Sequence, residues 1–227
     1  MNTQVNTPRI ITVDGPAGAG KGTLARRLAA QFDFAHLDTG KLYRAVGLAT
    51  LEAGGDPADP VDAVRAAEAL DAAAIAAGGL ENPALAGDDA ASAASRVAAI
   101  PEVRQVLLTF QRDFANHPPK GAKGAVLDGR DAGTVVCPEA PVKFFITAAA
   151  EERAKRRHKE LLDRGEASIY PRVLADMKER DVRDSTRAVA PLKPAEDART
   201  IDTSELDADA VFAAALEYIT EYIASVS

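Results

Sequence analysis

The sequence is poor in cysteine and histidine, and each shortage excludes a class of protein. A single cysteine, Cys137, among 227 residues excludes an intramolecular disulfide framework and suits a reducing compartment. The three histidines, His36, His117 and His158, show no metal-ligand spacing, so no cysteine–histidine metal cluster is expected. No run approaches the roughly 20 apolar residues that cross a membrane, and the polar N-terminus lacks the apolar core of a signal peptide. We therefore expect a cytoplasmic protein with no membrane partner.

Net positive charge is also missing. The formal net charge of −7 argues against a protein that coats nucleic acid polymer through a broad basic surface. Apolar residues make up 47% of the chain and charged residues 27%, which is typical of a globular protein. Arginine is nevertheless concentrated between positions 153 and 187. Because salt screens charges beyond roughly 8 Å, a local basic pocket in an acidic protein indicates a small anionic ligand.

One stretch carries a strong functional signal. An apolar run, Ile10 to Val13, leads into Gly15-Pro16-Ala17-Gly18-Ala19-Gly20-Lys21-Gly22-Thr23, and a run with helical spacing follows. Strand, glycine-rich turn and helix are the context of a phosphate-binding loop. Glycines at 15, 18, 20 and 22 allow backbone angles closed to other residues, so that main-chain N–H groups can approach an anion. Lys21 adds a positive charge where the terminal phosphates of a nucleotide would lie.

Short strands alternate with helices along the rest of the chain, which predicts an α/β fold with a parallel sheet. The strands are predicted at 9–14, 34–37, 125–127, 142–147 and 199–202. The helices are predicted after the glycine-rich loop, at 60–76, 90–99, 101–115 and 148–163, from Pro171, and at 207–224. In the helix of residues 101–115, Arg104 and Arg112 lie off the core positions.

Charged and polar residues follow two of these strands. Asp38-Thr39-Gly40, with Tyr43 and Arg44, comes after the second strand, and Asp128-Gly129-Arg130-Asp131 after the third. Residues just beyond the carboxyl ends of parallel strands line the ligand crevice of such a sheet. The alternatives are that Tyr43 packs, that Arg44 is a solvated charge, and that Asp128 caps the next turn and pairs with Arg130.

Two arginine-rich helices follow the fourth strand. Arg153, Arg156 and Arg157 share one face of the first helix, and Asp176, Arg180, Arg183, Asp184 and Arg187 recur at helical spacing from Pro171 onward. One interpretation is a solvated surface laced with salt bridges. The other is a lid of positive charge, as phosphoryl transfer requires.

The chain offers a phosphate loop, arginines and aspartates but little acid–base equipment. Phosphoryl transfer depends mostly on positioning and charge stabilisation. A phosphate monoester, with a second pKa of about 6, is already a nucleophile at neutral pH and needs no strong base. The residues therefore predict a nucleoside monophosphate kinase.

Motifs spread over almost the whole chain, in the same order, resemble bacterial cytidylate kinase. They are Asp14-Gly15-Pro16 with the phosphate loop, Asp38-Thr39-Gly40 with Tyr43-Arg44, Asp128-Gly129-Arg130-Asp131-Ala132-Gly133-Thr134-Val135-Val136, Glu179-Arg180-Asp181 with Arg183-Asp184, and Arg187-Ala188-Val189-Ala190-Pro191-Leu192. The resemblance implies transfer of the γ-phosphate of ATP to CMP or dCMP with Mg²⁺, in pyrimidine nucleotide metabolism. It leaves the magnesium ligands open.

The resemblance also implies residue roles. Residues Gly15 to Thr23 would hold ATP. Arg44, Arg130 and Arg180 would bind the acceptor phosphate, and Arg156 and Arg157 would neutralise the transferring group or flank the adenine. Thr39, Tyr43 and Asp184 would contact the sugar, and Ser95, Arg104, Asp131 and Arg187 would read cytosine. Lys21, Arg130, Arg180, Arg156 and Arg157 would be the catalytic set.

The implied architecture is a three-layer phosphate-loop kinase fold with five parallel strands. Its core would span 8–56, 99–152 and 188–227, its nucleoside-monophosphate-binding insert 57–98, and its arginine-rich lid 153–187. Two features depart from the family pattern. Thr39 replaces a usual serine, and residues 71–91 are short and alanine-rich where the family carries a small antiparallel sheet, so we expect helix or loop there.

Other functions fit less well. An adenylate or shikimate kinase would need a different acceptor pocket from the Asp128–Asp131 stretch. A regulatory GTPase would need an Asn-Lys-x-Asp stretch, which is absent from the sequence. A protein that binds nucleotide without turnover would not need the arginine-rich lid. No long apolar seam is left over once the sheet is covered, and we expect a monomer.

Overall fold

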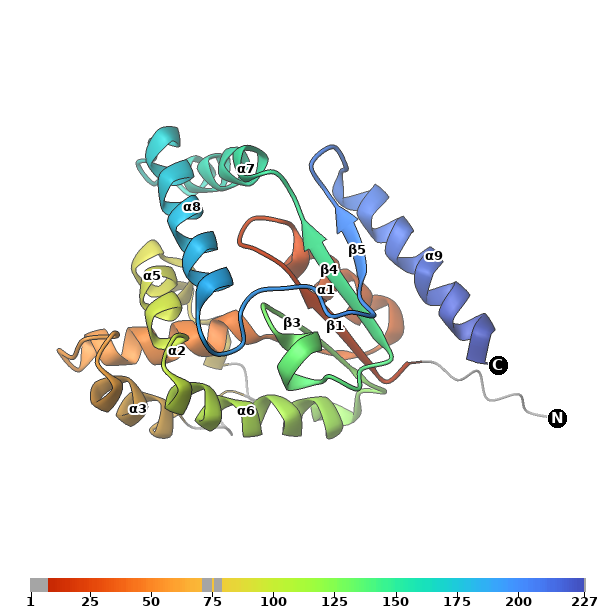
Figure 1. The fold of residues 1–227 in the computed structure, drawn as a ribbon, viewed down its shortest axis with the longest axis horizontal. Helices are drawn as coiled ribbons and strands as arrows, with labels where there is room; N and C mark the ends of the chain where they lie inside the picture. Colours follow the sequence, from red (N-terminus) through yellow and green to blue (C-terminus); the bar gives the residue numbers. More distant parts are fainter. Residues whose placement is uncertain (1–7, 71–74, 76–78, 227) are drawn as a thin grey trace.

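The computed structural model describes residues 8–70, 75 and 79–226 and contains a five-stranded parallel sheet (Figure 1). The strand order is β2-β3-β1-β4-β5, and every adjacent pair is parallel. The strands are β1 (Ile10–Asp14), β2 (Ala35–Asp38), β3 (Ala125–Gly129), β4 (Val142–Thr147) and β5 (Arg199–Asp202). All five predicted strands are present, and the predicted α/β fold is confirmed.

Alternating side chains divide the sheet between two cores. In β3, Val126 packs into the core that contains helices α1 (Lys21–Phe32) and α9 (Ala208–Val226). Its neighbours Ala125 and Leu127 face the other core, which contains α2 (Thr39–Glu52) and α6 (Pro101–Asn116). Because successive side chains of a strand point to opposite faces, helices cover both faces of the sheet. The sheet with a layer of helices on each face forms the three predicted layers.

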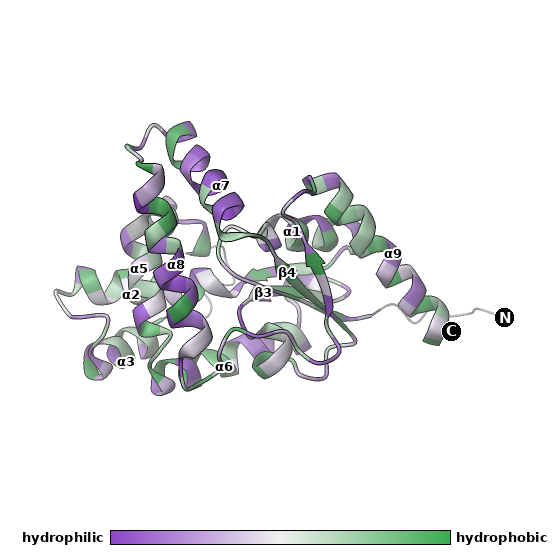
Figure 2. Ribbon diagram, turned by 45° about the horizontal axis from the view of Figure 1, so that its top comes forward, coloured by the Kyte–Doolittle hydropathy of each residue, from purple (hydrophilic) through white to green (hydrophobic). Residues whose placement is uncertain are grey.

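Further helices and short turns complete the described part of the fold. They are α3 (Pro60–Glu68), the short turns η1 (Gly79–Glu81) and η2 (Pro83–Ala86), α5 (Asp88–Val97), η3 (Pro119–Gly121), the π-helical turn η4 (Ala132–Val136), α7 (Ala150–Asp163) and α8 (Tyr170–Thr186). The helices α7 and α8 stand together at the end toward which β4 points (Figure 1). Much of α7 is hydrophilic (Figure 2).

The alanine-rich segment differs from the predicted helix of residues 60–76. Asp59 caps α3 as expected, by accepting from the N–H groups of Val61 and Asp62, but the helix ends at Glu68. Most of the residues predicted to continue it, 71–74 and 76, lie outside the described part. Residues 79–98 form η1, η2 and α5, so the described residues of the segment 71–91 are helix and loop, as expected. Among the described residues, no helix is long and apolar enough to cross a membrane.

A glycine sets the approach of α2 to α5. A β-carbon on Gly47 would lie 2.7 Å from that of Ala93 and 3.0 Å from the backbone nitrogen of Ala94. We expect Gly47→Ala to push the helices apart and to cost roughly 1–3 kcal/mol of stability. At about 2–4 °C per kcal/mol, thermal unfolding would show a clearly lower Tm. Gly87→Ala, where the new β-carbon meets only the Ala84 carbonyl oxygen at 3.5 Å, is the control. Equal Tm values for the two variants would contradict this account.

Candidate active site

The glycine-rich loop joins β1 to α1 and needs glycine at three positions. Gly15, Gly18 and Gly20 have φ angles of +152°, +75° and +93°. A β-carbon on Gly15 would also overlap the carbonyl oxygen of Ile146 in β4. Gly22 lies in the first turn of α1 without a positive φ, so the prediction that it needs unusual backbone angles is wrong. The N–H groups of the first turn of a helix lack intrahelical partners, so this end of α1 presents donors to an anion.

Lys21, the first residue of α1, lies between arginines and aspartates. Burial, reinforced by the charge of Arg130, lowers the pKa of Lys21 to about 7, against the opposing effect of Asp128 and Asp38. A phosphate group beside Lys21 would favour the charged amine and raise this pKa again. The surroundings of Lys21 therefore disfavour its positive charge, and the phosphates of a nucleotide would stabilise that charge.

Asp184 on α8 is the centre of a first cluster. Its carboxylate accepts from Nε of Arg130 at 2.9 Å and from the hydroxyl of Ser95 at 3.2 Å, and Nε of Arg180 lies 3.8 Å away. Burial alone would raise the pKa of Asp184, but Arg130 and Arg180 outweigh it, and the pKa lies below its ordinary value. Burial, and then Arg130, lower the pKa of Arg180 to about 10. Residues from α5, from α8 and from the end of β3 thus meet at one buried carboxylate.

Asp131 is the centre of a second cluster. Arg104 of α6 donates to Oδ2 of Asp131, and Nη2 of Arg187 lies 3.8 Å from Oδ1. The guanidinium of Arg104 lies 5.4 Å from the ring centre of Tyr43, which is itself buried. Burial raises the pKa of Tyr43, so its hydroxyl stays protonated. Four predicted substrate residues are therefore in one place.

Arg104 differs from its predicted position on α6. The prediction that Arg104 and Arg112 lie off the core is correct for Arg112, which is exposed. It is wrong for Arg104, which is 7% exposed. A guanidinium can be buried when a carboxylate pairs with it, and Asp131 pairs with Arg104. Helical periodicity alone cannot distinguish a paired buried arginine from a solvated one.

Two buried donors in these clusters have no hydrogen-bond partner among the described residues. They are Nε of Arg180 and Nη2 of Arg187. Buried polar groups are nearly always hydrogen-bonded, and an exception needs an explanation. Each belongs to a different cluster, and the oxygen atoms of an anionic ligand would satisfy both.

The other predicted substrate residues border the same crevice. Thr39 donates to the backbone carbonyl of Asp128 at 2.8 Å, which ties the start of α2 to the end of β3. Arg44 donates to the Leu85 carbonyl at 2.7 Å, and its charge contributes to the lowered pKa of Arg180. Ser95, predicted to read the base, contacts Asp184 of the first cluster. The alternative pair of Asp128 and Arg130 is not formed, because Arg130 bonds to Asp184.

The three arginines of α7 have different partners. Arg153 is buried and donates to the carbonyl of Ala17 at 3.1 Å and to the carboxylate of Asp181, so it joins the phosphate loop to α7 and α8. Arg156 donates to the hydroxyl of Thr203 at 2.9 Å, and Arg157 forms an ion pair with Glu160 at 3.1 Å. The sequence did not indicate the bridging role of Arg153 and Asp181.

A small cavity lies beside the phosphate loop on the α9 side. Its volume is about 230 Å³, and Ala19, Gly20, Arg156, Leu206 and Val211 are among its lining residues. Thr203, which also lines it, donates to the carbonyl of Ala19 at 3.0 Å. An apolar cavity next to a phosphate-binding loop, with an arginine at its side, has the character of a site for a flat aromatic base.

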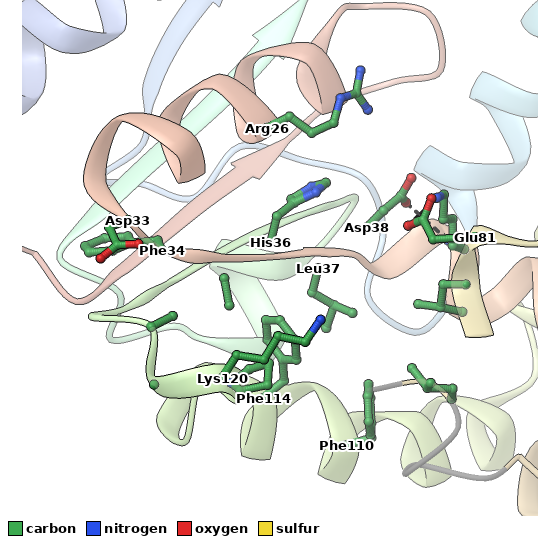
Figure 3. Close-up of a pocket in the computed structure, with 17 residues that line it drawn as sticks. Arg26, Asp33, Phe34, His36, Leu37, Asp38, Glu81, Phe110, Phe114 and Lys120 are labelled. Atoms are coloured by element: carbon green, nitrogen blue, oxygen red, sulfur yellow. Dashed lines mark hydrogen bonds and ion pairs between the residues drawn. The ribbon is translucent and has the colours of Figure 1, made fainter. Parts of the chain in front are cut away.

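A larger cavity, of about 590 Å³, lies beside the edge strand β2 (Figure 3). Its lining combines Phe110 and Phe114 of α6 with Arg26, His36 and Asp38. His36 forms a 2.7 Å hydrogen bond with the carboxylate of Asp128, a contact that the sequence did not indicate. None of the described residues that line this cavity is a predicted substrate residue, but Asp38 belongs to the predicted ligand crevice, so the cavity borders the predicted site.

Asp14, the last residue of β1, is a buried carboxylate whose charge is costly. Burial raises its pKa to about 7, although hydrogen bonds from the N–H groups of Gly133 and Ala132 oppose the shift. Asp14 binds its proton more tightly in the folded protein than in the unfolded chain. The folded protein therefore becomes less stable as the pH rises from the pKa of Asp14 in the unfolded chain to its pKa in the folded protein.

We therefore expect the free energy of unfolding of the wild type, relative to Asp14→Asn, to fall by roughly 2–4 kcal/mol as the pH rises from about 4 to about 7. It should stay constant above that interval. Urea unfolding at several pH values would measure this difference. A difference that does not change with pH would contradict the raised pKa of Asp14.

Comparison with known proteins assigns the chain to a family. The sequence model of "Cytidylate kinase" matches residues 11–221. The chain belongs to the cytidylate kinase family. It is 62% identical over 210 residues to the cytidylate kinase of Paramagnetospirillum magneticum, covering 92% of this chain and 97% of that protein. It is 58% identical over 210 residues to that of Rhodospirillum rubrum, covering 92% and 96%. The predicted family is confirmed.

A solved structure is similar in fold alone. An uncharacterized protein from Eubacterium ventriosum has a TM-score of 0.53 and 17% identity, covering 93% of this chain and 98% of that protein. Membership of the cytidylate kinase family makes this chain a nucleoside monophosphate kinase, as the phosphate loop and the two arginine–aspartate clusters predict.

Proposed function

We propose that this kinase transfers the γ-phosphoryl group of ATP to CMP or dCMP and releases ADP with CDP or dCDP. The observation that carries the proposal is the pair of clusters beside the phosphate loop. Arg130 and Arg180 meet at Asp184, while Arg104 and Arg187 meet at Asp131. One cluster has the chemistry to bind a phosphate, and the other has a buried carboxylate between cationic donors.

The first cluster would bind the acceptor phosphate. The unpartnered Nε of Arg180 is buried next to Arg130 and within the influence of Arg44. Three guanidinium groups near one point favour a dianion over any neutral acceptor, because arginine matches the geometry of phosphate oxygens. The dianionic phosphate of CMP would then be held as the nucleophile, with its negative charge balanced and without a general base.

The second cluster would read the base. A carboxylate of Asp131 accepts from the exocyclic amine of cytosine, while Arg104 and Arg187 can donate to the ring carbonyl and nitrogen. Uracil presents a carbonyl where cytosine presents the amine, and that carbonyl would face the carboxylate. A site built to hydrogen-bond one group rejects an analogue that lacks it by orders of magnitude. Tyr43 and Thr39 would lie along the nucleoside between the clusters.

The donor end would use the phosphate loop. Residues Gly15 to Thr23 would bind the phosphates of ATP through backbone N–H groups and Lys21, and the cavity beside Arg156 and Thr203 would hold the adenine. Arg156 would thus flank the base. Arg157, the next residue of α7, would neutralise charge on the transferring group once its ion pair with Glu160 opens.

The residues present also fit a magnesium ion. No group of three or more His, Cys, Asp or Glu side chains among the described residues could hold a metal ion by itself. Magnesium bound with ATP usually needs only one or two carboxylates beside the phosphates. The hydroxyl of Thr23 and the carboxylates of Asp38 and Asp128, which are register partners in the sheet, would supply that share. Bound there with ATP, the ion would supply positive charge that neutralises the phosphates.

The proposal also includes the division of the chain into a core of residues 8–56, 99–152 and 188–227, an insert of residues 57–98 and a lid of residues 153–187. It further includes a monomeric enzyme and a cytoplasmic location.

Purified protein with ATP and Mg²⁺ should form ADP rapidly with CMP and dCMP, much more slowly with UMP, and at background rate with AMP or shikimate. Equal rates with UMP would refute the proposed role of Asp131. No rate with CMP or dCMP would refute the proposed acceptor.

A further inference from the structure

We propose that Asp14 and Arg112 are positioning residues for base recognition, because they hold the two ends of η4, the turn that carries Asp131. The inference rests on the proposed function. The hydrogen bonds of Asp14 and Arg112 to this segment go to backbone groups rather than to the Asp131 side chain, although burial and, to a smaller extent, the charge of Asp131 raise the pKa of Asp14. Both act on the backbone that follows Asp131.

Asp14 holds the first end of the turn. Its two carboxylate oxygens accept from the N–H groups of Ala132 and Gly133 at 2.8 and 2.7 Å. Asp14 is 4% exposed. Burying a carboxylate is costly unless it is hydrogen-bonded, and here the bonds to η4 offset part of that cost. Because the turn begins at Ala132, these are the N–H groups directly after Asp131.

Arg112 holds the other end of the turn. Its guanidinium donates to the carbonyls of Val135 and Val136 at 3.0 and 3.1 Å. Inside the turn, the carbonyl of Asp131 accepts from the N–H of Val135 at 2.9 Å. The backbone of Asp131 thus lies between β3, which ends at Gly129, and a turn held on both sides.

The packing around η4 leaves little freedom. A β-carbon on Gly133 would lie 2.7 Å from the hydroxyl of Thr12 and 3.3 Å from Oδ2 of Asp14. Glycine at 133 is therefore needed for the close approach of the turn to β1. Since Asp14 directly precedes the phosphate loop, this contact also fixes the base-reading residue relative to the loop that would bind ATP.

The mechanism predicts what an amide would do at position 14. An asparagine has one acceptor oxygen and one NH₂ group, so one of the two N–H groups would face another donor. The turn would shift away, and the carboxylate of Asp131 would move with it. Recognition of the cytosine amine depends on this carboxylate, whereas binding of ATP depends on the loop and Lys21.

Steady-state kinetics at pH 8, where Asp14 is ionised, provide the test. For Asp14→Asn we expect a higher KM for CMP and a ratio of kcat/KM for CMP over UMP that is lower by about tenfold, as for a lost bond to a charged group. The KM for ATP should change less than about twofold. Arg112→Met should lower the same ratio less, because Arg112 is exposed.

Thr12→Val is the matched control. Thr12 lies two residues before Asp14 in β1, points to the same turn, and has a buried hydroxyl with no hydrogen-bond partner among the described residues. Removing this hydroxyl changes the packing under η4 but none of its hydrogen bonds, so the ratio should not change. An unchanged ratio in Asp14→Asn, or an equal fall in Thr12→Val, overturns the proposal. If Asp14→Asn does not fold, an unchanged ratio in Arg112→Met overturns it.

Hydrogen exchange separates this inference from the proposed function. Amide exchange in residues 131–137 should be at least about tenfold faster in Asp14→Asn than in the wild type, and unchanged in Thr12→Val, whichever nucleotide the protein phosphorylates. If amide exchange in residues 131–137 is unchanged in Asp14→Asn, the claim that Asp14 holds η4 in place is overturned. A wild type that shows no preference for CMP, with the exchange result as expected, would instead refute the proposed acceptor.

Discussion

Asp131→Asn should lower kcat/KM for CMP by about 10²- to 10³-fold and change the value for UMP much less. The carboxylate of Asp131 is buried between Arg104 and Arg187, so it is held as an acceptor only. An asparagine can present its NH₂ group to the uracil carbonyl as readily as its oxygen to the cytosine amine. Steady-state rates of ADP formation with each acceptor, at saturating ATP, measure the effect.

The ratio of the two kcat/KM values is the decisive quantity for Asp131. Removing the charge also leaves Arg104 buried without its partner, and breaking a buried pair is destabilising. A smaller folded fraction lowers both rates equally and leaves their ratio unchanged. Asp113→Asn, which removes an exposed carboxylate from the same helix as Arg104, is the control. A CMP preference that survives in Asp131→Asn would exclude Asp131 from base recognition.

Lys21→Met should lower kcat by about 10³-fold, with the Tm unchanged or raised. Removing one preorganised donor from developing charge costs about 10²- to 10³-fold in other enzymes, and Lys21 would carry a full charge once a phosphate beside it raises its pKa. Its lowered pKa in the free protein means that burial of the charged amine destabilises the folded protein. A methionine of similar length has no charge to bury. The activity should therefore fall while the stability rises or stays the same.

Thermal unfolding and single-turnover rates on the same Lys21→Met sample would test this separation. Lys159→Met, which removes an exposed lysine from α7, is the control and should affect neither quantity. A loss of activity that is fully explained by a lower Tm would show that Lys21 has a structural role. An active Lys21→Met protein would show that the loop binds phosphate without this residue.

The sequence predicted the features that depend on local pattern. A short apolar run before a glycine-rich stretch predicts strand, loop and helix, and the structure has these at β1, 15–20 and α1. Residues that follow parallel strands share one edge of the sheet, which is why the sequence alone could place Arg130 and Asp131 in the crevice. The resemblance in motifs then added Arg104 and Arg187, and the structure brings both to Asp131.

The features that the sequence did not predict depend on contacts between distant residues. Asp14 and Gly133 are 119 positions apart, and His36 and Asp128 are 92 apart. Hydrophobic periodicity says nothing about which buried acceptor meets which donor. The same limit explains Arg104, whose burial depends on a carboxylate from another element, and Arg153, whose partner Asp181 lies on the next helix.

The central claim is that the γ-phosphoryl group moves from ATP onto the phosphate of CMP, and ³¹P nuclear magnetic resonance of the reaction mixture tests it most directly. ADP forms in hydrolysis as well as in transfer, but only transfer creates a second diphosphate. We predict that the signals of CDP appear at the same rate as those of ADP, with no inorganic phosphate. Inorganic phosphate in place of CDP, or an unchanged spectrum, would contradict the account.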